Sequence, residues 1–583
     1  MNHRGFRVFW VAVLVLSAAV FACAQSKKLT ILHTNDTHSA MVPFETGFIP
    51  AVGPAPNETA LIGAGLWDFW RFPFNQDYAG IARMATLIKT LRLKDKNVLA
   101  LNAGDVFVGS FEFNKFLGYP ELKIMDNLYD AMELGNHEFD LGTDTLAGVL
   151  SGYIAGAAPV AMPILCANVN FVGTSLNGMV QPSIIRTVGG IQVGIFGLVT
   201  QEPQNYSDDV NALFPYPYQG SGMTLWEYAG GLAAGLRKQG CAVIICVSHL
   251  GTALDVAFLS QVPGIDVIIG GHSHDAYPQP IMANGKIIVQ AGQFGWYLGE
   301  LKLNVGKGGV TLDSWVLHRV DGRIKEDPQV RTIVNNVRSG VVSDPRFGDV
   351  YGQHVALALR DIKKSWPAKS QNRDTALGNL VTDAFVAQLK KAGLPFPVDC
   401  ALDVLGYLGA DIPAGKVVGN TILRAVPYGY DQASGLDFKV VVVPLPPGLL
   451  LGGLEYAADM VTLTTDLAVQ ASGLTCAYDS SKAPAPDLLH LSRLDPMSVM
   501  VNGELVVAQL SNPDKYYYVA MSDQVFNFLN ALTKDPDHPQ GQLTSFPTGL
   551  FEYNIVRDYM KSLRFVQVKS EGRIKDTAPM TVK

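Results

Sequence analysis

Apolar runs and segments of helical periodicity alternate along the first half of the chain, and polar clusters separate them. Runs rich in β-branched and apolar residues predict strands, whereas apolar residues at helical spacing over 81–93 predict a helix. Strands that alternate with helices and end in polar loops indicate an α/β sandwich whose functional site lies along the strand ends. The predicted strands are 29–33, 98–102, 191–197, 242–247 and 267–269.

The pattern is interrupted between residues 321 and 369. A helix is predicted over 328–337, because Asp327 is a suitable N-cap and Pro328 is harmless in a first turn. Beyond this helix, the periodicity indicates a second α/β domain. Its first predicted elements are a helix over 377–386 and strands over 438–443 and 516–520.

The length of the chain also indicates more than one domain. A chain of 583 residues is too long for one hydrophobic core. Together with the interrupted pattern, this predicts four divisions: a signal peptide over 1–24, a first domain over 27–325, a linker region over 326–368 and a C-terminal domain over 369–583.

The N-terminus is typical of an export signal. Arg4 and Arg7 form a positive region, and the apolar run over 8–21 is short for a membrane span. Ala22-Cys23-Ala24 fits the small-x-small pattern for cleavage before Gln25. We therefore expect an exported protein of the periplasm or cell envelope. Two alternatives stay open: a lipid anchor on Cys23, and an uncleaved signal anchor.

Composition excludes some roles. Hydrophobic residues make up 48% of the chain and charged residues 17%, which argues for packed domains and against extended disorder. The net charge is −7, and no basic stretch is dense enough to follow a nucleic-acid backbone. Nucleic acid is therefore not an expected partner. A small phosphate-bearing substrate is still compatible with this charge, since bound metal ions can neutralise it locally.

The six cysteines are scattered and form neither a disulfide framework nor a CxxC metal pair. Cys241 and Cys246 are five residues apart, so on one strand they would point to opposite faces. We therefore expect both to be core residues and not a disulfide bridge.

Polar residues with metal-ligand chemistry follow the predicted strands. Asp36 and His38 are two apart and would share a face, and His272 and His274 have the same spacing after two glycines. Such a mixture of carboxylate, amide and imidazole donors suits two transition-metal ions that share a bridging carboxylate. The candidate ligands are Asp36, His38, Asp105, Asn136, His249, His272 and His274.

His137 is a candidate for catalysis. It directly follows Asn136, so it is poorly placed to bind the same ion but well placed to face a substrate. Asp140, three residues on, would accept its ring N–H if the segment is helical there. Such a pair keeps the imidazole charged and oriented, able to stabilise a transferring group or to protonate a leaving oxygen. The alternative is a purely structural Asp–His pair.

These residues lie in motifs that resemble a known family. LTILHTNDTH, NAGDVFVGS, MELGNHEFDLG, VSHLG and IIGGHSHD, in this order, resemble the exported 5′-nucleotidase/UDP-sugar hydrolase family. DTALGNLVTDAF, ILRAVPYG, ASGLTCAYD and VNGEL resemble that family's C-terminal domain. The resemblance implies a four-layer α/β/β/α metallophosphoesterase sandwich followed by a C-terminal α/β nucleotide-binding domain.

The resemblance also implies roles for the candidate residues. Asp36, His38 and His274 would bind one divalent ion, and Asn136, His249 and His272 the other, with Asp105 bridging. The ions would be of the Zn, Mn, Co or Fe class, and metal-bound hydroxide would attack phosphorus in line. His137 and Asp140 match the family's catalytic dyad. In the family, a rotation of the C-terminal domain brings the substrate phosphate to the metals.

The C-terminal domain departs from the family where the substrate would bind. Gly409 stands in place of the family's arginine, just before Ile412-Pro413-Ala414-Gly415, and the family's GGDG-like segment has no clear counterpart. Tyr428 matches one aromatic residue that stacks on the nucleobase. The missing second aromatic would have to come from Phe526, Phe528, Phe546 or Phe551, each of which is otherwise a core residue.

The expected function is that of an exported metal-dependent phosphomonoesterase, which hydrolyses nucleotides to nucleoside and phosphate. Its partner would be a small-molecule phosphate ester, and a membrane would be contacted only through a lipid anchor at Cys23. One alternative is a hydrolase of the same fold that acts on UDP-sugars, cyclic phosphates or sulfur esters. The other is a non-catalytic envelope protein that keeps the metal site.

Overall fold

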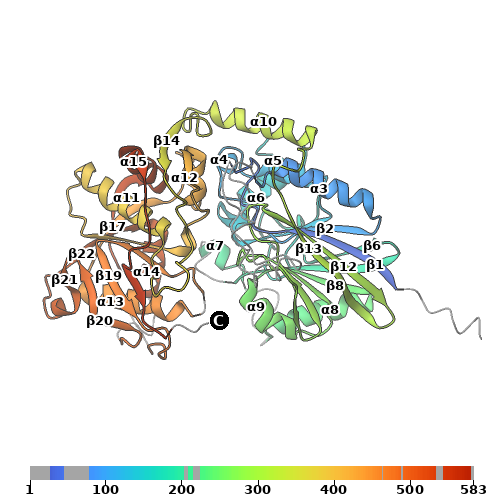
Figure 1. The fold of residues 1–583 in the computed structure, drawn as a ribbon. Coiled ribbons are helices and arrows are strands. Elements are labelled where there is room, and N and C mark those ends of the chain that lie inside the picture. Colours follow the sequence, from blue (N-terminus) through green and yellow to red (C-terminus); the bar gives the residue numbers. More distant parts are fainter. Residues whose placement is uncertain are drawn as a thin grey trace, which may run out of the picture.

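The computed structural model describes residues 26–44, 78–201, 208–214, 223–462, 464–486, 490–533 and 542–579. The predicted export signal over 1–24 lies outside these residues. Within the described ranges, no helix combines the length and the apolar character needed to span a membrane. Two domains lie side by side, and α10 (Pro328–Val342) runs across the top from one to the other (Figure 1).

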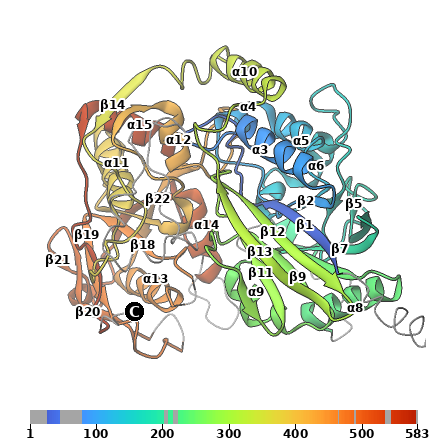
Figure 2. The same ribbon diagram turned by 45° about the vertical axis from the view of Figure 1, so that its right-hand side comes forward.

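The N-terminal domain contains two sheets packed face to face (Figure 2). The first has the order β13 (Gly309–Arg319), β12 (Tyr297–Gly306), β1 (Lys27–Thr34), β2 (Val98–Asn102), β3 (Ala131–Glu133), β4 (Ile164–Leu165), β5 (Val180–Gln181). The second has the order β10 (Ile281–Ala283), β11 (Lys286–Val289), β9 (Val267–Gly270), β8 (Val243–His249), β7 (Ile191–Val199), β6 (Ser183–Val188).

Helices cover the outer faces of both sheets. Apolar side chains of β1 point to both faces of its sheet, so both faces must be covered. Leu29 and Ile31 pack between the sheets, whereas Leu32 packs in the cluster that contains Ile88 of α3. The result is the expected four-layer α/β/β/α sandwich. The helices are α3 (Ile81–Lys94), α4 (Phe111–Phe116), α5 (Tyr119–Met125) and α6 (Gly142–Leu150) on the first sheet, and α8 (Leu225–Lys238) and α9 (Thr252–Ala257) on the second.

The link between the domains begins with α10, which is capped as expected. The Asp327 carboxylate accepts hydrogen bonds from the backbone N–H groups of Gln329 and Val330, and Pro328 opens the helix. The helix continues five residues beyond the predicted end and lies over the outer helices of the first domain (Figure 1).

The C-terminal domain is a second α/β unit built around a five-stranded sheet. That sheet has the order β18 (Val469–Ser472), β15 (Cys400–Val404), β22 (Tyr517–Ser522), β17 (Lys439–Leu445), β23 (Phe546–Phe551). Two smaller sheets contain β16 (Gly415–Val418), β14 (His354–Ala358), β24 (Phe565–Val566), and β21 (Glu504–Leu505), β20 (Leu494–Val501), β19 (Leu474–Tyr478), β25 (Ile574–Asp576). The helices are α11 (Ala376–Ala392), α12 (Gly419–Ala425), α13 (Pro447–Met460), α14 (Asp523–Thr533) and α15 (Glu552–Leu563).

The five cysteines within the described ranges are all free and buried, as expected. One detail of the expectation is wrong. Cys241 and Cys246 pack in the same cluster under α8, and not on opposite faces. The reason is that β8 begins only at Val243, so Cys241 lies in the turn before the strand and does not follow its alternation.

An acidic side chain is buried between the two sheets of the first domain. Glu133, at the end of β3, is fully buried, and its two carboxyl oxygens have no hydrogen-bond partner. Gly197 of β7 faces it, and a Cβ at that glycine would lie 1.3 Å from Glu133 Oε2. Burial raises the pKa of Glu133 well above its ordinary value, so the folded protein holds this group as the neutral acid.

We therefore expect Glu133→Gln to change how stability depends on pH. Above the unfolded pKa of about 4.3, unfolding releases the proton that folded Glu133 retains, so the wild type loses up to about 1.4 kcal/mol per pH unit as pH rises. Glutamine carries no such proton. The variant should match the wild type near pH 4 and exceed it near pH 8, in urea unfolding of the EDTA-treated proteins. A stability difference that does not vary with pH contradicts this assignment, and Glu326→Gln, on a half-exposed glutamate, is the control.

Candidate metal centre

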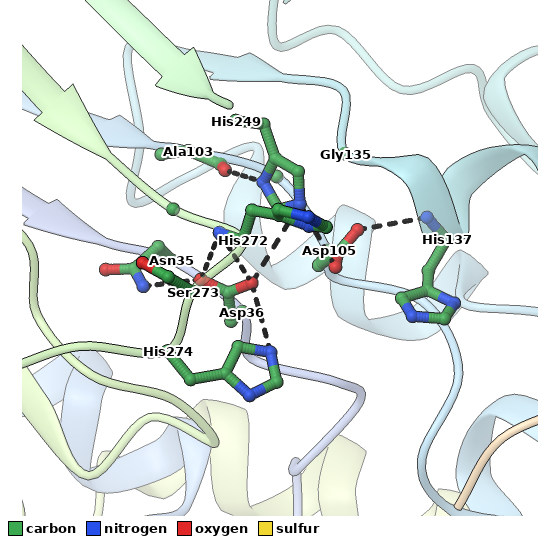
Figure 3. A network of polar contacts seen from close by, with 12 residues as sticks. Asn35, Asp36, Ala103, Asp105, Gly135, His137, His249, His272, Ser273 and His274 are labelled. Carbon is green, nitrogen blue, oxygen red and sulfur yellow. Dashed lines mark hydrogen bonds and ion pairs between the residues drawn. The ribbon is translucent and has the colours of Figure 1, made fainter. Parts of the chain in front are cut away.

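The predicted ligands meet at the carboxyl ends of strands from both sheets. Parallel strands β1, β2 and β3 of one sheet are followed by Asp36, Asp105 and Asn136. Parallel strands β8 and β9 of the other sheet lead to His249 and His272. Figure 3 shows side chains from both sheets facing one another around one centre.

One group of four residues can hold a single ion. The ligand atoms of Asp36, His38, Asp105 and His274 lie within 4.8 Å of one another. His38 Nε2 lies 3.0 Å from His274 Nε2, which lies 3.3 Å from Asp36 Oδ1. Ligand atoms at such spacings fit a shared ion with bonds of about 2.0–2.2 Å.

A second group shares one carboxylate with the first. Asp105, His249 and His272 offer ligand atoms within 4.8 Å of one another, and His249 Nε2 lies 3.1 Å from Asp105 Oδ2. The other ring nitrogen of His249 lies 2.6 Å from the carbonyl oxygen of Ala103, an arrangement in which Nδ1–H donates and Nε2 keeps a free lone pair. Asn136 Oδ1 is buried without a hydrogen-bond partner. Asp105 is thus placed to bridge two ions, and the donor chemistry fits divalent metals.

The backbone at this centre is strained. Five ligand residues have φ values in the left-handed region, which residues other than glycine rarely adopt. Such conformations persist only where surrounding contacts impose them, and they gather at functional sites. The residues are Asp36 (φ 50°), His38 (46°), Asp105 (54°), His272 (73°) and His274 (59°).

Glu138 imposes part of this geometry. Its carboxylate accepts hydrogen bonds from the backbone N–H groups of Asp105 (3.0 Å), Val106 (2.8 Å), Phe107 (3.0 Å) and Gly135 (2.6 Å). The two loops it joins approach so closely that a Cβ on Gly135 would lie 2.1 Å from Asp105 Oδ1. This role of Glu138 was not predicted, and the one signal for it in the sequence is its place in the GNHEFD motif.

Two amides support the other ligand loops, and these too were not predicted. Asn35 Nδ2 donates to Asp36 Oδ2 and to the carbonyl oxygen of Gly292, both at 2.5 Å. Gln290 Nε2 donates to the carbonyl oxygen of Gly271 at 3.1 Å. Their partners are mostly backbone groups, so they leave no residue-type signature in the sequence.

The predicted His137–Asp140 pair forms. Residues Asn136–Phe139 make a short 3₁₀ helix, which brings His137 Nδ1 to 2.8 Å from Asp140 Oδ2. The His137 side chain remains 19% exposed. Burial disfavours the charged imidazole, but the carboxylates of Asp140 and Asp105 outweigh it and raise the pKa of His137 to about 9.

Tyr428, from the C-terminal domain, lies directly against this pair. Its ring stacks on the His137 imidazole, with centroids 5.1 Å apart and planes at 11°, and meets His38 edge-on at 5.9 Å. Within the described residues, the ring contacts of Tyr428 are with His38 and His137, and none is with the other predicted aromatics. Phe526 packs against the core of the C-terminal domain, and Phe551 lies beside the Lys439 ammonium.

The packing of the backbone around Gly409 explains why glycine stands here in place of the arginine that the family resemblance implies. A Cβ at Gly409 would lie 2.3 Å from the carbonyl oxygen of Arg424 and 2.6 Å from Pro427 Cγ. Gly409 N–H also donates to the carbonyl oxygen of Ala425. Because the two segments touch backbone to backbone, no larger residue fits at this position without rearrangement.

Comparisons with known proteins point to the same chemistry. The profile of the calcineurin-like phosphoesterase family matches residues 29–276, and that of the 5′-nucleotidase C-terminal domain matches residues 360–528. The snake venom 5′-nucleotidase of Crotalus adamanteus is 33% identical over 96% of this chain and 92% of its own. The 5′-nucleotidase of Diplobatis ommata is 25% identical over 94% of this chain and 89% of its own.

Solved structures show the same architecture. The 5′-nucleotidase precursor of Thermus thermophilus superposes with a TM-score of 0.73 at 26% identity, covering 95% of this chain and 100% of that one. The sulfate thiohydrolase SoxB of the same organism reaches 0.69 at 17% identity, covering 94% of this chain and 96% of that one, which shows a shared fold. The resemblance inferred from the motifs and the two expected kinds of domain are thereby confirmed.

Replacing Glu138 tests whether its carboxylate holds the metal loops. Glu138→Gln leaves one acceptor oxygen and turns an NH₂ group toward backbone N–H donors, so we expect metal affinity to fall about 10- to 100-fold. Competition with a chelator, followed by metal analysis, measures the affinity. Glu133→Gln, also on a buried glutamate but one without backbone partners, is the matched control and should bind as the wild type does. Wild-type affinity in Glu138→Gln would contradict the role.

Proposed function

The chain belongs to the 5′-nucleotidase family of metallophosphoesterases, which are hydrolytic enzymes, and we propose that it is an exported phosphomonoesterase that cleaves nucleotides to nucleoside and phosphate. The single observation that supports this best is the arrangement of two ligand groups that share Asp105, with the His137–Asp140 pair beside them. Export is supported by the charged and apolar segments of residues 1–24. Cys23 is then either removed with the signal or lipidated.

Two divalent ions are the proposed cofactors. Asp36, His38 and His274 would hold one ion, Asn136, His249 and His272 the other, and Asp105 both. The buried Asn136 Oδ1, which has no hydrogen-bond partner, fits this assignment, because such an atom costs free energy unless a ligand binds it. Their mixture of nitrogen and oxygen donors suits the Zn, Mn, Co or Fe class. Ions bound there would supply an activated water as the nucleophile and neutralise the phosphoryl oxygens.

His137 is the proposed catalytic residue, and Asp140 orients it. With Nδ1 bonded to Asp140, the other ring nitrogen is free to face a bound phosphate ester. The backbone N–H of His137 donates to Asp105 Oδ1 at 3.0 Å, which ties the residue to the candidate bridging carboxylate. A charged imidazole here stabilises negative charge on the transferring phosphoryl group or protonates the leaving oxygen.

The packing at Gly409 supports a second candidate function. Since no side chain fits at that position, the C-terminal domain lacks one guanidinium with which to grip a nucleotide phosphate. Hydrolysis of UDP-sugars, cyclic phosphates or sulfur esters at the same metal centre is the alternative. A substrate panel with nucleoside monophosphates, UDP-sugars, cyclic nucleotides and sulfate esters separates these activities. No hydrolysis of any member at full metal occupancy would instead indicate a non-catalytic metal-binding protein.

The central test is turnover with Mn²⁺, Co²⁺ or Zn²⁺ on that panel. We expect nucleoside monophosphates and simple aryl phosphates to be cleaved. The His137→Ala variant should have a kcat about 10²- to 10⁴-fold lower than the wild type and an unchanged metal content, since the imidazole acts on the substrate. His354→Ala, at an exposed histidine of β14, is the control. Unchanged turnover in His137→Ala would remove His137 from the mechanism.

A further inference from the structure

Arg424, at the end of α12 in the C-terminal domain, contacts the metal domain (the N-terminal domain, which carries the candidate metal ligands). The residue is only 3% exposed. Its guanidinium donates to the carbonyl oxygens of Val42 (2.6 Å) and Pro43 (3.4 Å) and lies 3.8 Å from the ring centroid of Phe44. A buried guanidinium that donates to carbonyl oxygens and lies over an aromatic ring makes a directional contact between the domains.

The segment that receives Arg424 belongs to the metal centre. Residues 42–44 follow the candidate ligand His38 by only a few positions. Ser39 N–H donates to the carbonyl oxygen of Val106 at 2.7 Å, next to the candidate bridging ligand Asp105. Phe44 exchanges two backbone hydrogen bonds with Tyr78, at 2.9 and 3.3 Å. The acceptors of Arg424 are therefore fixed to the same loops that carry the metal ligands.

Tyr428 follows Arg424 by four residues, and its ring covers the His137 imidazole. The intervening turn is short and well bonded, since Val426 N–H donates to the carbonyl oxygens of Ile422 and Leu423. Tyr428 is 5% exposed. A shift of the Arg424 end of this segment would therefore move the Tyr428 ring across the face of His137.

We propose that Arg424 is a positioning residue, which docks the segment 424–428 on the metal domain and so holds the Tyr428 ring against His137. The inference rests on the proposed function insofar as His137 acts on the substrate. Asp140 fixes one ring nitrogen of His137, and the Tyr428 stack fixes the plane of the ring. Together they restrict both the position and the tilt of the imidazole beside the candidate metal centre.

The contact is local, because the domains also meet elsewhere. Asn114 Nδ2 donates to the carbonyl oxygen of Gly435 at 2.9 Å, and Phe111 of α4 packs on Tyr553 of α15 with centroids 5.3 Å apart. Loss of Arg424 should therefore release the Tyr428 ring without separating the domains. Asn114→Ala removes a different interdomain hydrogen bond and serves as the matched control.

The first experiment measures the accessibility of His137 and needs no substrate. Diethyl pyrocarbonate modifies exposed imidazoles in their neutral form, so all variants are compared at one pH, and peptide mass spectrometry gives the rate at His137 alone. We expect this rate to rise roughly two- to tenfold in Arg424→Ala and in Tyr428→Leu, in line with the loss of one aromatic pair. Asn114→Ala should keep the wild-type rate. So should Arg493→Ala, which removes a buried arginine that donates to carbonyl oxygens within the C-terminal domain. An unchanged rate in both Arg424→Ala and Tyr428→Leu overturns the proposal.

The second experiment is a double-mutant cycle on kcat. Arg424→Ala and Tyr428→Leu should each lower kcat about 10- to 100-fold, because a small misplacement of a catalytic group costs that much. The double variant should lose no more than the larger single loss, since both act through one ring. Arg424→Lys, which can still donate to a carbonyl, should be intermediate. Additive losses, or a rise in kcat that would mark the stack as an obstruction, overturn the proposal.

The two experiments separate this inference from the proposed function. If the wild-type protein hydrolyses nothing on the panel, the proposed function fails, but the modification rates still test the Arg424 contact. If the wild-type protein is active and Arg424→Ala retains full kcat with unchanged His137 reactivity, only the inference fails. Should Arg424→Ala not fold, Tyr428→Leu and Arg424→Lys carry the same tests.

Discussion

The candidate metal centre depends on one carboxylate that binds no metal in the proposed scheme. Glu138 collects backbone N–H groups from the loop after β2 and from the loop after β3. Together with the His137 N–H that donates to Asp105 Oδ1, Glu138 holds two loops with strained left-handed backbone in contact with each other. A buried carboxyl group that both loops share therefore helps to set the distance between the candidate ligands Asp105 and Asn136.

The centre is also a product of both domains. An aromatic cluster that contains Phe44, Phe294 and Trp296 contacts His38 through Phe294 and extends to Ala410 of the C-terminal domain. Arg424 and Tyr428 approach the same region from that domain. Tyr428, for which the family resemblance implies a role in substrate binding, thus contacts His137, the proposed catalytic residue. A change in domain orientation would alter the surroundings of His137 directly, without a chain of intermediate contacts.

Much of this could be predicted from the sequence, because strand ends, turn glycines and ligand types are local signals. The elements that carry Asp36, Asp105 and His249, and the His137–Asp140 pair, follow from such signals. The role of Glu138 could not be predicted, since its partners are backbone groups that any residue offers. The Tyr428 contact with His137 depends on how two domains dock, and periodicity contains no information on that. The roles predicted for Phe526 and Phe551 in substrate binding stay predictions.

The place of β1 in its sheet has a consequence for how the chain acquires its structure. β1 lies between β2 and β12, and its antiparallel pairing joins residues 27–33 to residues 299–305. The loop that must close is thus about 270 residues long, which gives the first domain a high contact order and slows its folding. At a synthesis rate of about 5–20 residues per second, β12 is made well after its partner β1. The metal domain therefore completes its fold late. Such a delay would suit the proposed export, in which a chain stays unfolded until it has crossed a membrane.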